Sequence, residues 1–298
     1  MSGRAGRALA QAKINLALRV LGKLPDGYHS IETVFLRLEL GDDVEVRSTG
    51  GKRSLKCYAM RDQPPEKNLA YRAAEIYAEE TGWPKGFEVE IVKNIPIGGG
   101  LGGGSADAAA VLRILNKLSS KPLAPEKLLE LAGRVGSDVP FLASGFVMAL
   151  AWGRGEKMLE LPPLPPRDVQ LFVPPYGVPT GEAYALLAAE RGAAPSRVPE
   201  LTSEMFSDWE SAAANSVNDF EGVVRKRRPE IDSWLKSGER FGLLCRMTGT
   251  GSTVFLVGGT TTLPPEAAQG LSFLALPLGA RGITTRIATG VVPVEILD

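Results

Sequence analysis

The sequence has a single histidine, two cysteines and no excess of charge of either sign. Lys plus Arg and Asp plus Glu each number 34, so the net charge is zero and nothing indicates a nucleic-acid or membrane partner. Cys57 and Cys245 are far apart and neither belongs to a CxxC pair, which argues against a disulfide framework or a cysteine zinc site. Reduced thiols in a cytoplasmic enzyme are therefore expected.

Long apolar runs are also missing. No segment approaches the roughly 18 apolar residues that a membrane helix needs. Arg4 and Arg7 precede a short apolar stretch, but Gln11 and Lys13 interrupt it, which argues against a signal peptide. The 298 residues have the composition of a globular protein, long enough for about two domains at roughly 150 residues each.

Hydrophobic alternation predicts a strand between Ala12 and Val20, which would place Lys13 and Asn15 on one face. The same reasoning predicts further strands and, from helical spacing, several helices. The strands are expected over 31–40, 43–47, 87–92, 146–151 and 169–173, and over 244–257 around a small-residue loop. The helices are expected over 66–81, 106–118, 125–135, 181–191 and 220–235.

The order of these elements indicates the fold class. Strands come first and a mixed region follows without regular βαβ alternation, which favours an α+β fold over a doubly wound sheet. The proline-rich segment 162–166 marks the expected domain boundary. Residues 1–163 and 164–298 would then form two domains.

The strongest feature is the segment from Pro96 to Ser105, in which six of the seven residues 98–104 are glycine. Such a run is costly in backbone entropy and is expected where the backbone must approach a ligand closely. The segment lies between a predicted strand and a predicted helix, whose N-terminus Ser105 or Asp107 would serve. Backbone N–H groups and a helix N-terminus would face one spot, which favours a phosphate site over a flexible linker.

Two common phosphate-binding motifs fit this segment poorly. A P-loop needs a lysine before its serine, and Gly104 stands there instead. Gly98, Gly100 and Gly103 satisfy G-x-G-x-x-G, but a dinucleotide-binding fold needs a strand with an acidic end after the helix. Here a second helix is predicted at that place.

Four segments together resemble the GHMP kinases, the superfamily of galactose, homoserine, mevalonate and phosphomevalonate kinases. They are Ala12–Leu16 with Pro25–His29, the loop from Ile95 to Asp107, Gly136–Phe141 and Met247–Phe255. The resemblance is closest to the branch that acts on a cytidine diphosphate polyol. The sequence departs from the usual pattern at Gln11, Ala106, Thr248 and Thr250. Of these, only Ala106 lacks a hydroxyl that the family usually has. This loop therefore has no second serine to contact metal or phosphate.

The resemblance implies an α+β fold of two domains, the first like ribosomal protein S5 domain 2 and the second ferredoxin-like. ATP and substrate would meet in the cleft between them. The implied reaction is ATP-dependent phosphorylation of the 2-hydroxyl of 4-(cytidine 5'-diphospho)-2-C-methyl-D-erythritol, in the non-mevalonate route to isoprenoid precursors. Mg²⁺ would accompany ATP without a dedicated protein ligand. The partners would be small molecules, and the protein would be a monomer or homodimer.

The resemblance implies catalytic roles for Lys13 and Asp138. Asp138 would be the general base for the substrate hydroxyl, and Lys13 would activate that hydroxyl and stabilise negative charge. Taken alone, these residues leave other roles open. Asp138 can be the N-cap of a helix, and Lys13 can be a charged residue that protects a strand edge.

Substrate contacts are implied for a further set of residues. Asn15 would hold the methylerythritol end of the substrate. Tyr28 would stack on cytosine, and His29 would hydrogen-bond it. Tyr184 would close the other face, unless it belongs to a helix core. The implied substrate-binding residues are Asn15, Tyr28, His29, Asp138, Thr180 and Tyr184.

ATP contacts are implied mainly for the glycine loop. Asn68 would contact adenine, and Lys93 would contact phosphate or sugar. The loop residues are Pro96, Gly98, Gly99, Gly100, Leu101, Gly102, Gly103, Gly104 and Ser105. A second small-residue loop, 247–253, would lie near the active site, unless it is a plain turn between strands.

Two other functions fit parts of the sequence. One is a GHMP kinase for another alcohol, such as homoserine. Homoserine has no ring on which the Asp-Gly-Tyr-His segment, Asp26–His29, could stack. A sugar-sensing regulator on the same fold would need neither Lys13 nor Asp138. Both are therefore less consistent with the sequence than a kinase for a cytidine substrate.

Overall fold

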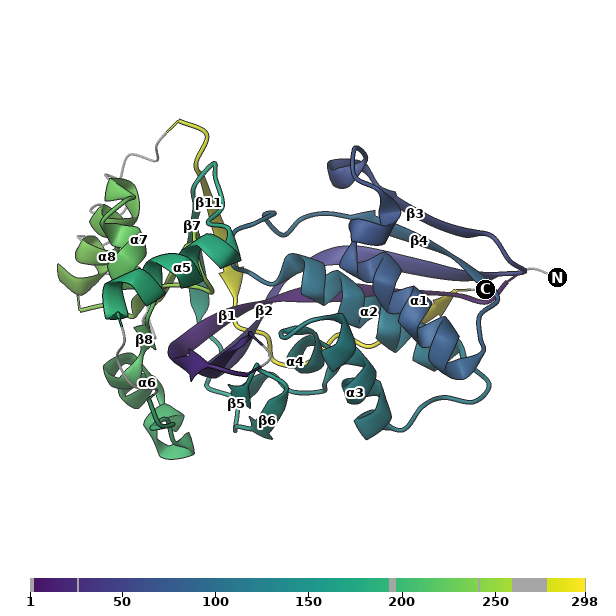
Figure 1. The fold of residues 1–298 in the computed structure, drawn as a ribbon, viewed down its shortest axis with the longest axis horizontal. Helices are drawn as coiled ribbons and strands as arrows, with labels where there is room; N and C mark the ends of the chain where they lie inside the picture. Colours follow the sequence, from purple (N-terminus) through teal and green to yellow (C-terminus); the bar gives the residue numbers. More distant parts are fainter. Residues whose placement is uncertain (1–2, 26, 193–196, 241, 259–277, 298) are drawn as a thin grey trace.

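A computed structural model gives the fold, and it describes residues 3–25, 27–192, 197–240, 242–258 and 278–297. The chain forms an eight-stranded sheet covered by helices and a smaller four-stranded sheet with helices of its own (Figure 1). The predicted α+β class is confirmed. No helix in these described ranges is long and apolar enough to cross a membrane.

The larger sheet is built on a long antiparallel hairpin of β1 and β2. Strand β8 pairs with β1 in parallel, β5 pairs with β2, and the other neighbours follow the order β12-β1-β2-β4-β3. Strand β6 extends the sheet beyond β5. The strands are β1 (Ala5–Lys23), β2 (His29–Thr49), β3 (Arg53–Cys57), β4 (Gly86–Val92), β5 (Met148–Gly153), β6 (Lys157–Glu160), β8 (Val217–Asn218) and β12 (Glu295–Leu297).

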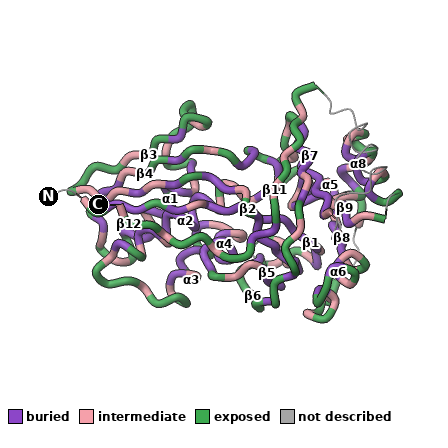
Figure 2. Tube along the Cα trace, turned by 180° about the vertical axis from the view of Figure 1, so that it is seen from behind, coloured by how far each residue is buried: buried purple, intermediate pink, exposed green. Residues whose placement is uncertain are grey.

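Four helices follow the first strands; α1, α2 and α4 contact this sheet, and α3 packs on these three helices. Helix α2 contacts both β1 and β2, and its buried side is made mainly of alanine, valine and leucine. Buried residues run along β1, β2 and α2 through the middle of the molecule (Figure 2). The helices are α1 (Leu69–Thr81), α2 (Gly103–Leu118), α3 (Pro125–Val135) and α4 (Val139–Ala143).

The smaller sheet is antiparallel throughout and has the order β11-β7-β10-β9. Helix α8 packs on it, and the Phe172 and Trp234 rings stack with centroids 5.5 Å apart. The elements are β7 (Asp168–Val173), α5 (Thr180–Arg191), α6 (Trp209–Asn215), α7 (Glu221–Arg225), α8 (Pro229–Arg240), β9 (Cys245–Met247), β10 (Val254–Val257) and β11 (Arg281–Arg286).

The proline-rich segment 162–166 lies between β6 of the larger sheet and β7 of the smaller one. The division into residues 1–163 and 164–298 stays a prediction. The later half does contribute β8 and β12 to the larger sheet, both paired with β1. The strand that carries Lys13 is therefore flanked by segments from both ends of the chain.

Several predicted boundaries differ from the structure. The expected strands 31–40 and 43–47 are one strand, β2, whose register with β1 shifts between the pairs Gln11↔Gly41 and Lys13↔Arg37. The expected helix 220–235 is two helices, because Pro229 has no N–H to continue a helix from α7 and instead begins α8. Helix α1 begins at Leu69, where Asn68 caps it. Asp26 of the predicted turn lies outside the described residues.

Candidate active site

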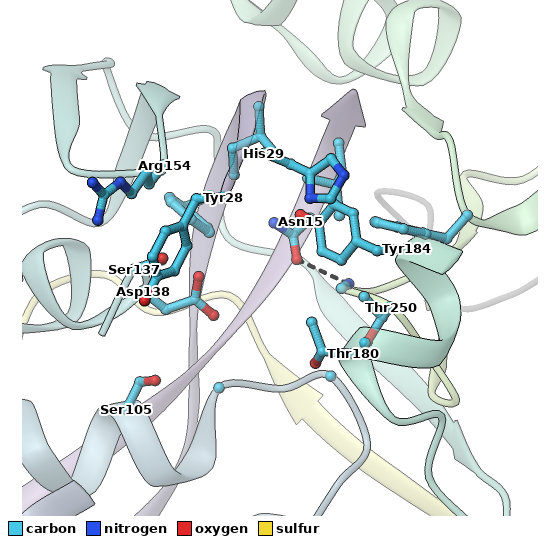
Figure 3. A pocket seen from close by; sticks show the side chains of 18 of the residues that line it. Asn15, Tyr28, His29, Ser105, Ser137, Asp138, Arg154, Thr180, Tyr184 and Thr250 are labelled. Carbon is cyan, nitrogen blue, oxygen red and sulfur yellow. Dashed lines mark hydrogen bonds between the residues drawn. The ribbon is translucent and has the colours of Figure 1, made fainter. Parts of the chain in front are cut away.

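A cavity of about 780 Å³ lies where β1, β2, the glycine loop, α5 and the loop 247–253 meet (Figure 3). Its lining contains all of the predicted catalytic and substrate-binding residues. These are Lys13, Asn15, Tyr28, His29, Asp138, Thr180 and Tyr184, together with Gly100, Gly102 and Ser105 of the glycine loop. Residues separated by more than 150 positions in the sequence are thus brought to one site.

Lys13 and Asp138 face one another in this cavity. The Lys13 Nζ lies 3.3 Å from Asp138 Oδ2, with the lysine side chain 3% exposed and the aspartate side chain 30% exposed. Asp138 does stand at the N-cap position of α4, but its side chain makes no capping hydrogen bond to that helix, so the carboxylate is not used as a cap. The edge-protection role is wrong for Lys13, because β1 is an interior strand and this lysine is buried.

Asn15 is a central hydrogen-bonding residue of the site. Its Oδ1 accepts hydrogen bonds from Lys13 Nζ at 2.7 Å and from the Gly249 N–H at 3.0 Å. Its Nδ2 donates to Thr33 Oγ1 at 2.8 Å. The Thr248 hydroxyl lies within 3.2 Å of the same Oδ1 and accepts from the Asn15 N–H. The amide therefore ties the Lys13 ammonium to the second loop, a role that its predicted substrate contact did not include.

Close contacts with other segments of the protein account for some of the glycines in the glycine loop. Gly98, Gly100 and Gly102 have positive φ values of 74°, 80° and 74°. A Cβ at Gly100 would lie 2.2 Å from the Thr248 carbonyl oxygen, and one at Gly102 would lie 3.0 Å from Lys13 Cγ. Two of these glycines are therefore required by the approach of the second loop and of Lys13.

Helix α2 begins inside the loop, at Gly103 rather than at the predicted Ala106. Its N-cap is Gly102, which has no side chain to cap the helix, so the prediction that Ser105 or Asp107 serves the N-terminus is wrong. The first N–H groups of a helix have no intrahelical partner and favour an anion. Ser105 lies in the first turn and lines the cavity, so this N-terminus opens toward Lys13 and Asp138.

The aromatic residues at the cavity mouth already contact other side chains of the protein. The rings of His29 and Tyr184 stack on one another, with centroids 4.2 Å apart, and Tyr184 also meets the edge of Phe220. Tyr28 is 56% exposed, and the Arg154 guanidinium lies over its ring at 4.3 Å (Figure 3). His29 thus covers one face of the Tyr184 ring.

The charge states at the mouth follow from burial. Burial, helped by the Lys23 ammonium, lowers the pKa of His29, so the imidazole is neutral at pH 7. Burial, with Asp138 nearby, raises the pKa of Tyr184 to about 12, so the phenol keeps its proton. Both rings are therefore uncharged and can donate hydrogen bonds to a neutral base.

Asn68 and Lys93 lie away from this cavity. Asn68 caps α1 by accepting the Ala70 N–H at 2.8 Å. Lys93 lines a second cavity of about 450 Å³ with Pro96 and Ile97 of the glycine loop and with Tyr176 and Arg281 from the later half. Its ammonium is paired with two buried carboxylates. Of the predicted ATP contacts, Gly100, Gly102 and Ser105 line the first cavity and Lys93 and Pro96 line the second, whereas Asn68 lines neither.

Sequence reasoning missed several residues of the site. Arg154 lies in the β5–β6 turn between Gly153 and Gly155, both with positive φ, and this glycine pair is the signal that could have marked a functional turn. The Phe35 ring lies under the Lys13 ammonium, with the ring centroid 5.6 Å from Lys13 Nζ. That contact has no sequence signal, because it depends on the β1–β2 register. The second loop, in contrast, was predicted near the site, and Gly249 and Thr250 do line the cavity.

The fold and this loop define a known class of enzymes. Residues 68–146 match the description "GHMP kinases N terminal domain", and residues 198–273 match "GHMP kinases C terminal". A crystal structure of homoserine kinase from Cytophaga hutchinsonii has a TM-score of 0.66 over 99% of this chain and 97% of its own, at 18% identity, which supports the fold alone. The chain has the GHMP kinase architecture.

Closer relatives share one name. The 4-diphosphocytidyl-2-C-methyl-D-erythritol kinase of Pelotomaculum thermopropionicum is 43% identical over 83% of this chain and 87% of its own length. The enzyme of that name from Paraburkholderia phytofirmans is 37% identical over 88% of each chain. A crystal structure of 4-(cytidine 5'-diphospho)-2C-methyl-D-erythritol kinase has a TM-score of 0.74 at 33% identity, over 95% of this chain and 100% of its own. The chain belongs to the 4-diphosphocytidyl-2-C-methyl-D-erythritol kinase family.

Proposed function

We propose that this protein transfers the γ-phosphoryl group of ATP to the 2-hydroxyl of 4-(cytidine 5'-diphospho)-2-C-methyl-D-erythritol, in the non-mevalonate route to isoprenoid precursors. The observation that carries the proposal is the Lys13–Asp138 pair, 3.3 Å apart beside the glycine loop in one cavity. The names of the relatives supply the substrate. The pair supplies the chemistry that phosphorylation of an alcohol needs.

Asp138 would accept the proton of the substrate hydroxyl. Its carboxylate is partly exposed toward the cavity and is not used as a helix cap, so an oxygen is available to a bound alcohol. A positioned general base contributes about 10²–10⁴ in rate. The proton would therefore leave the hydroxyl oxygen as that oxygen attacks the γ-phosphorus.

Lys13 would stabilise the charge that develops in this step. Its ammonium is held by Asn15 and Asp138 and is nearly excluded from water, so its charge is poorly screened and fixed in direction. The N–H groups at the start of α2 would hold the phosphates from the other side. Catalysis would thus rest on position and electrostatics, as is usual for phosphoryl transfer.

Mg²⁺ is proposed to enter with ATP on the phosphate oxygens. In the described part of the chain, no group of three or more His, Cys, Asp or Glu residues could hold a metal ion by itself. Mg²⁺ commonly binds through one or two carboxylates plus substrate phosphates and keeps several waters. When bound, it would neutralise charge on the phosphates, and Asp138 is the one carboxylate among the described residues that line this cavity.

The nucleoside of ATP is proposed to extend from the glycine loop toward the second cavity. Pro96, a predicted ATP contact, lines that cavity together with Ile97 of the same loop. The cytidine end of the other substrate would lie at the first cavity, toward Tyr28, His29 and Tyr184. A cytoplasmic location also stays a prediction, with which the free, buried thiols of Cys57 and Cys245 are consistent.

The substrate assignment predicts a large discrimination. With ATP saturating, the native enzyme should release ADP with 4-(cytidine 5'-diphospho)-2-C-methyl-D-erythritol at a kcat/KM at least about 100-fold above that with methylerythritol 4-phosphate, because binding energy of the cytidine moiety is used at the reacting centre. A coupled ADP assay with both compounds and homoserine measures this. Comparable values for the two polyols would reject the cytidine substrate and keep the kinase activity, and no ADP with any alcohol would reject the kinase.

The aromatic mouth supports a second prediction. Base–aromatic stacking is worth about 1–3 kcal/mol, or roughly 5- to 150-fold in affinity. Tyr28→Ala should therefore raise KM for the cytidine substrate by about tenfold or more and leave KM for ATP nearly unchanged. Tyr58→Ala is the matched control, because Tyr58 is likewise exposed beside a cation, Lys56, but does not line the first cavity. Equal effects of the two variants on the cytidine KM would contradict stacking by Tyr28.

A further inference from the structure

A buried cluster of three charged residues lies at the base of the glycine loop. The Lys93 ammonium pairs with Asp42, and it lies 2.7 Å from Asp107 Oδ2. The exposed fractions of the three side chains are 6% for Lys93, 0% for Asp42 and 3% for Asp107. Lys93 precedes the loop and Asp107 follows it, so their contact joins the two ends of the segment that bears the glycines.

Asp42 holds the first end of this segment by its backbone as well. Its Oδ1 accepts the N–H of Asn94 at 2.5 Å and the N–H of Ile95 at 2.7 Å. The carboxylate belongs to β2, so the start of the loop is bonded to the central sheet. The middle of the loop is held separately, by the Lys13 N–H on the Leu101 carbonyl and the Thr253 N–H on the Gly99 carbonyl.

We infer that Asp42, Lys93 and Asp107 are positioning residues for the phosphate site. By joining both ends of the loop, they fix the direction of its N–H groups and of the α2 N-terminus without touching the nucleotide. This differs from the direct ATP contact that was predicted for Lys93. The inference rests on the proposed kinase function, since it concerns how the same loop binds ATP.

The two carboxylates of the cluster are not equivalent. Both oxygens of Asp42 have hydrogen-bond partners, whereas Asp107 Oδ1 is buried with none among the residues that the structure describes. Burial raises the pKa of the Asp107 carboxyl to about 7, although the Lys93 ammonium favours its ionised form. The groups that face it are Lys93, Asp42 and the Cys57 thiol at the end of β3. Asp107 is thus the group in this cluster that takes up or releases a proton near neutral pH.

Ionisation of Asp107 adds one negative charge to a cluster that is neutral when this residue is protonated. The carboxyl lies on the fifth residue of α2, the helix whose N-terminus would hold the phosphates. A buried negative charge there opposes an anionic ligand, so protonation and ATP binding should favour one another. ATP affinity should therefore fall as the pH rises through about 7.

A double-mutant cycle on ATP binding tests the positioning role. ATP dissociation constants are measured by titration calorimetry, without the alcohol substrate, for the native chain, Lys93→Met, Asp107→Leu and the double variant. Each single variant should raise the ATP dissociation constant about tenfold. The double variant should raise it no further, because each single change already breaks the contact between the two ends of the loop. Lys93→Arg should restore most of the affinity, and KM for the cytidine substrate should stay close to the native value.

A pH series provides the second readout, with Asp107→Asn, which keeps the shape of the protonated acid. From about pH 6 to about pH 8 the native dissociation constant should rise several-fold more than that of Asp107→Asn; the phosphate ionisation of ATP, near pH 6, is common to both proteins. Equal pH dependence, or loss of affinity with Lys93→Met alone, would overturn the inference. If Lys93→Met does not fold, the pH series decides. A native chain that binds no ATP contradicts the kinase function as well, whereas ATP binding with additive effects contradicts only the positioning role.

Discussion

Asp138→Asn is expected to lower kcat by about two or more decades while the fold and the affinities for both substrates stay close to native. The amide has nearly the same shape as the carboxylate but cannot accept the proton of the substrate hydroxyl. It also carries no charge to pair with Lys13, whose ammonium keeps its hydrogen bond to Asn15 at 2.7 Å. Substrate binding, which uses the loop and the aromatic mouth, does not depend on that proton.

The measurement is steady-state kinetics with the cytidine substrate, together with calorimetric binding of ATP. Asp168→Asn is the matched control, because Asp168 is an exposed aspartate at the start of β7 and does not line the cavity. The control should keep full turnover. A folded Asp138→Asn enzyme that turns over at a rate within a few-fold of native would remove Asp138 from the mechanism. A loss confined to KM would make it a binding residue instead.

The parts of this site that could be predicted from the sequence are those with a local signal. Alternation along β1 places Lys13 and Asn15 on one face, and their side chains do meet. The glycine run indicates a backbone that a ligand must approach closely, and the residues after it do form a helix. Both conclusions depend only on neighbours within a few positions. They needed no knowledge of how distant segments pack.

The parts that could not be predicted depend on contacts between distant segments. One partner of Lys93 is Asp42, 51 positions away on β2, whereas the family resemblance implied only a ligand contact for this lysine. His29 stacks on Tyr184 because β2 and α5 meet at the cavity mouth. The close approach of Thr248 to Gly100 likewise joins loops 148 positions apart. In each case the residue type was noticed and its partner was not.

The break between α7 and α8 is different, because a local signal existed. Pro229 stands inside the segment that was expected to be one helix. Proline in a helix interior removes a hydrogen bond and clashes with the preceding turn, at a cost of about 3 kcal/mol or more. The chain avoids that cost by ending α7 at Arg225 and placing the proline at the first position of α8.

Gly102→Ala is expected to reduce kcat/KM by about 100-fold, although only one methyl group is added. Gly102 has a φ of 74°, so an alanine there would be held in the left-handed region at a cost of about 1–2 kcal/mol. The new Cβ would also lie 3.0 Å from Lys13 Cγ and 3.1 Å from its Cε. The lysine must then shift by a few tenths of an ångström, and its ammonium would leave the position set by Asn15 and Asp138.

Gly82→Ala separates the two causes of this loss. Gly82 has a φ of 70° at the C-terminus of α1, and a Cβ there would meet nothing within 4 Å. Its variant should therefore lose stability by about 1–2 kcal/mol in a urea titration and keep native turnover. Gly102→Ala should lose a similar amount of stability and, in addition, most of its activity, because small displacements of a catalytic group can cost about 10² in rate. Equal activities of the two variants would contradict this explanation. Gly102 would then be needed only for its backbone conformation and not for the space beside Lys13.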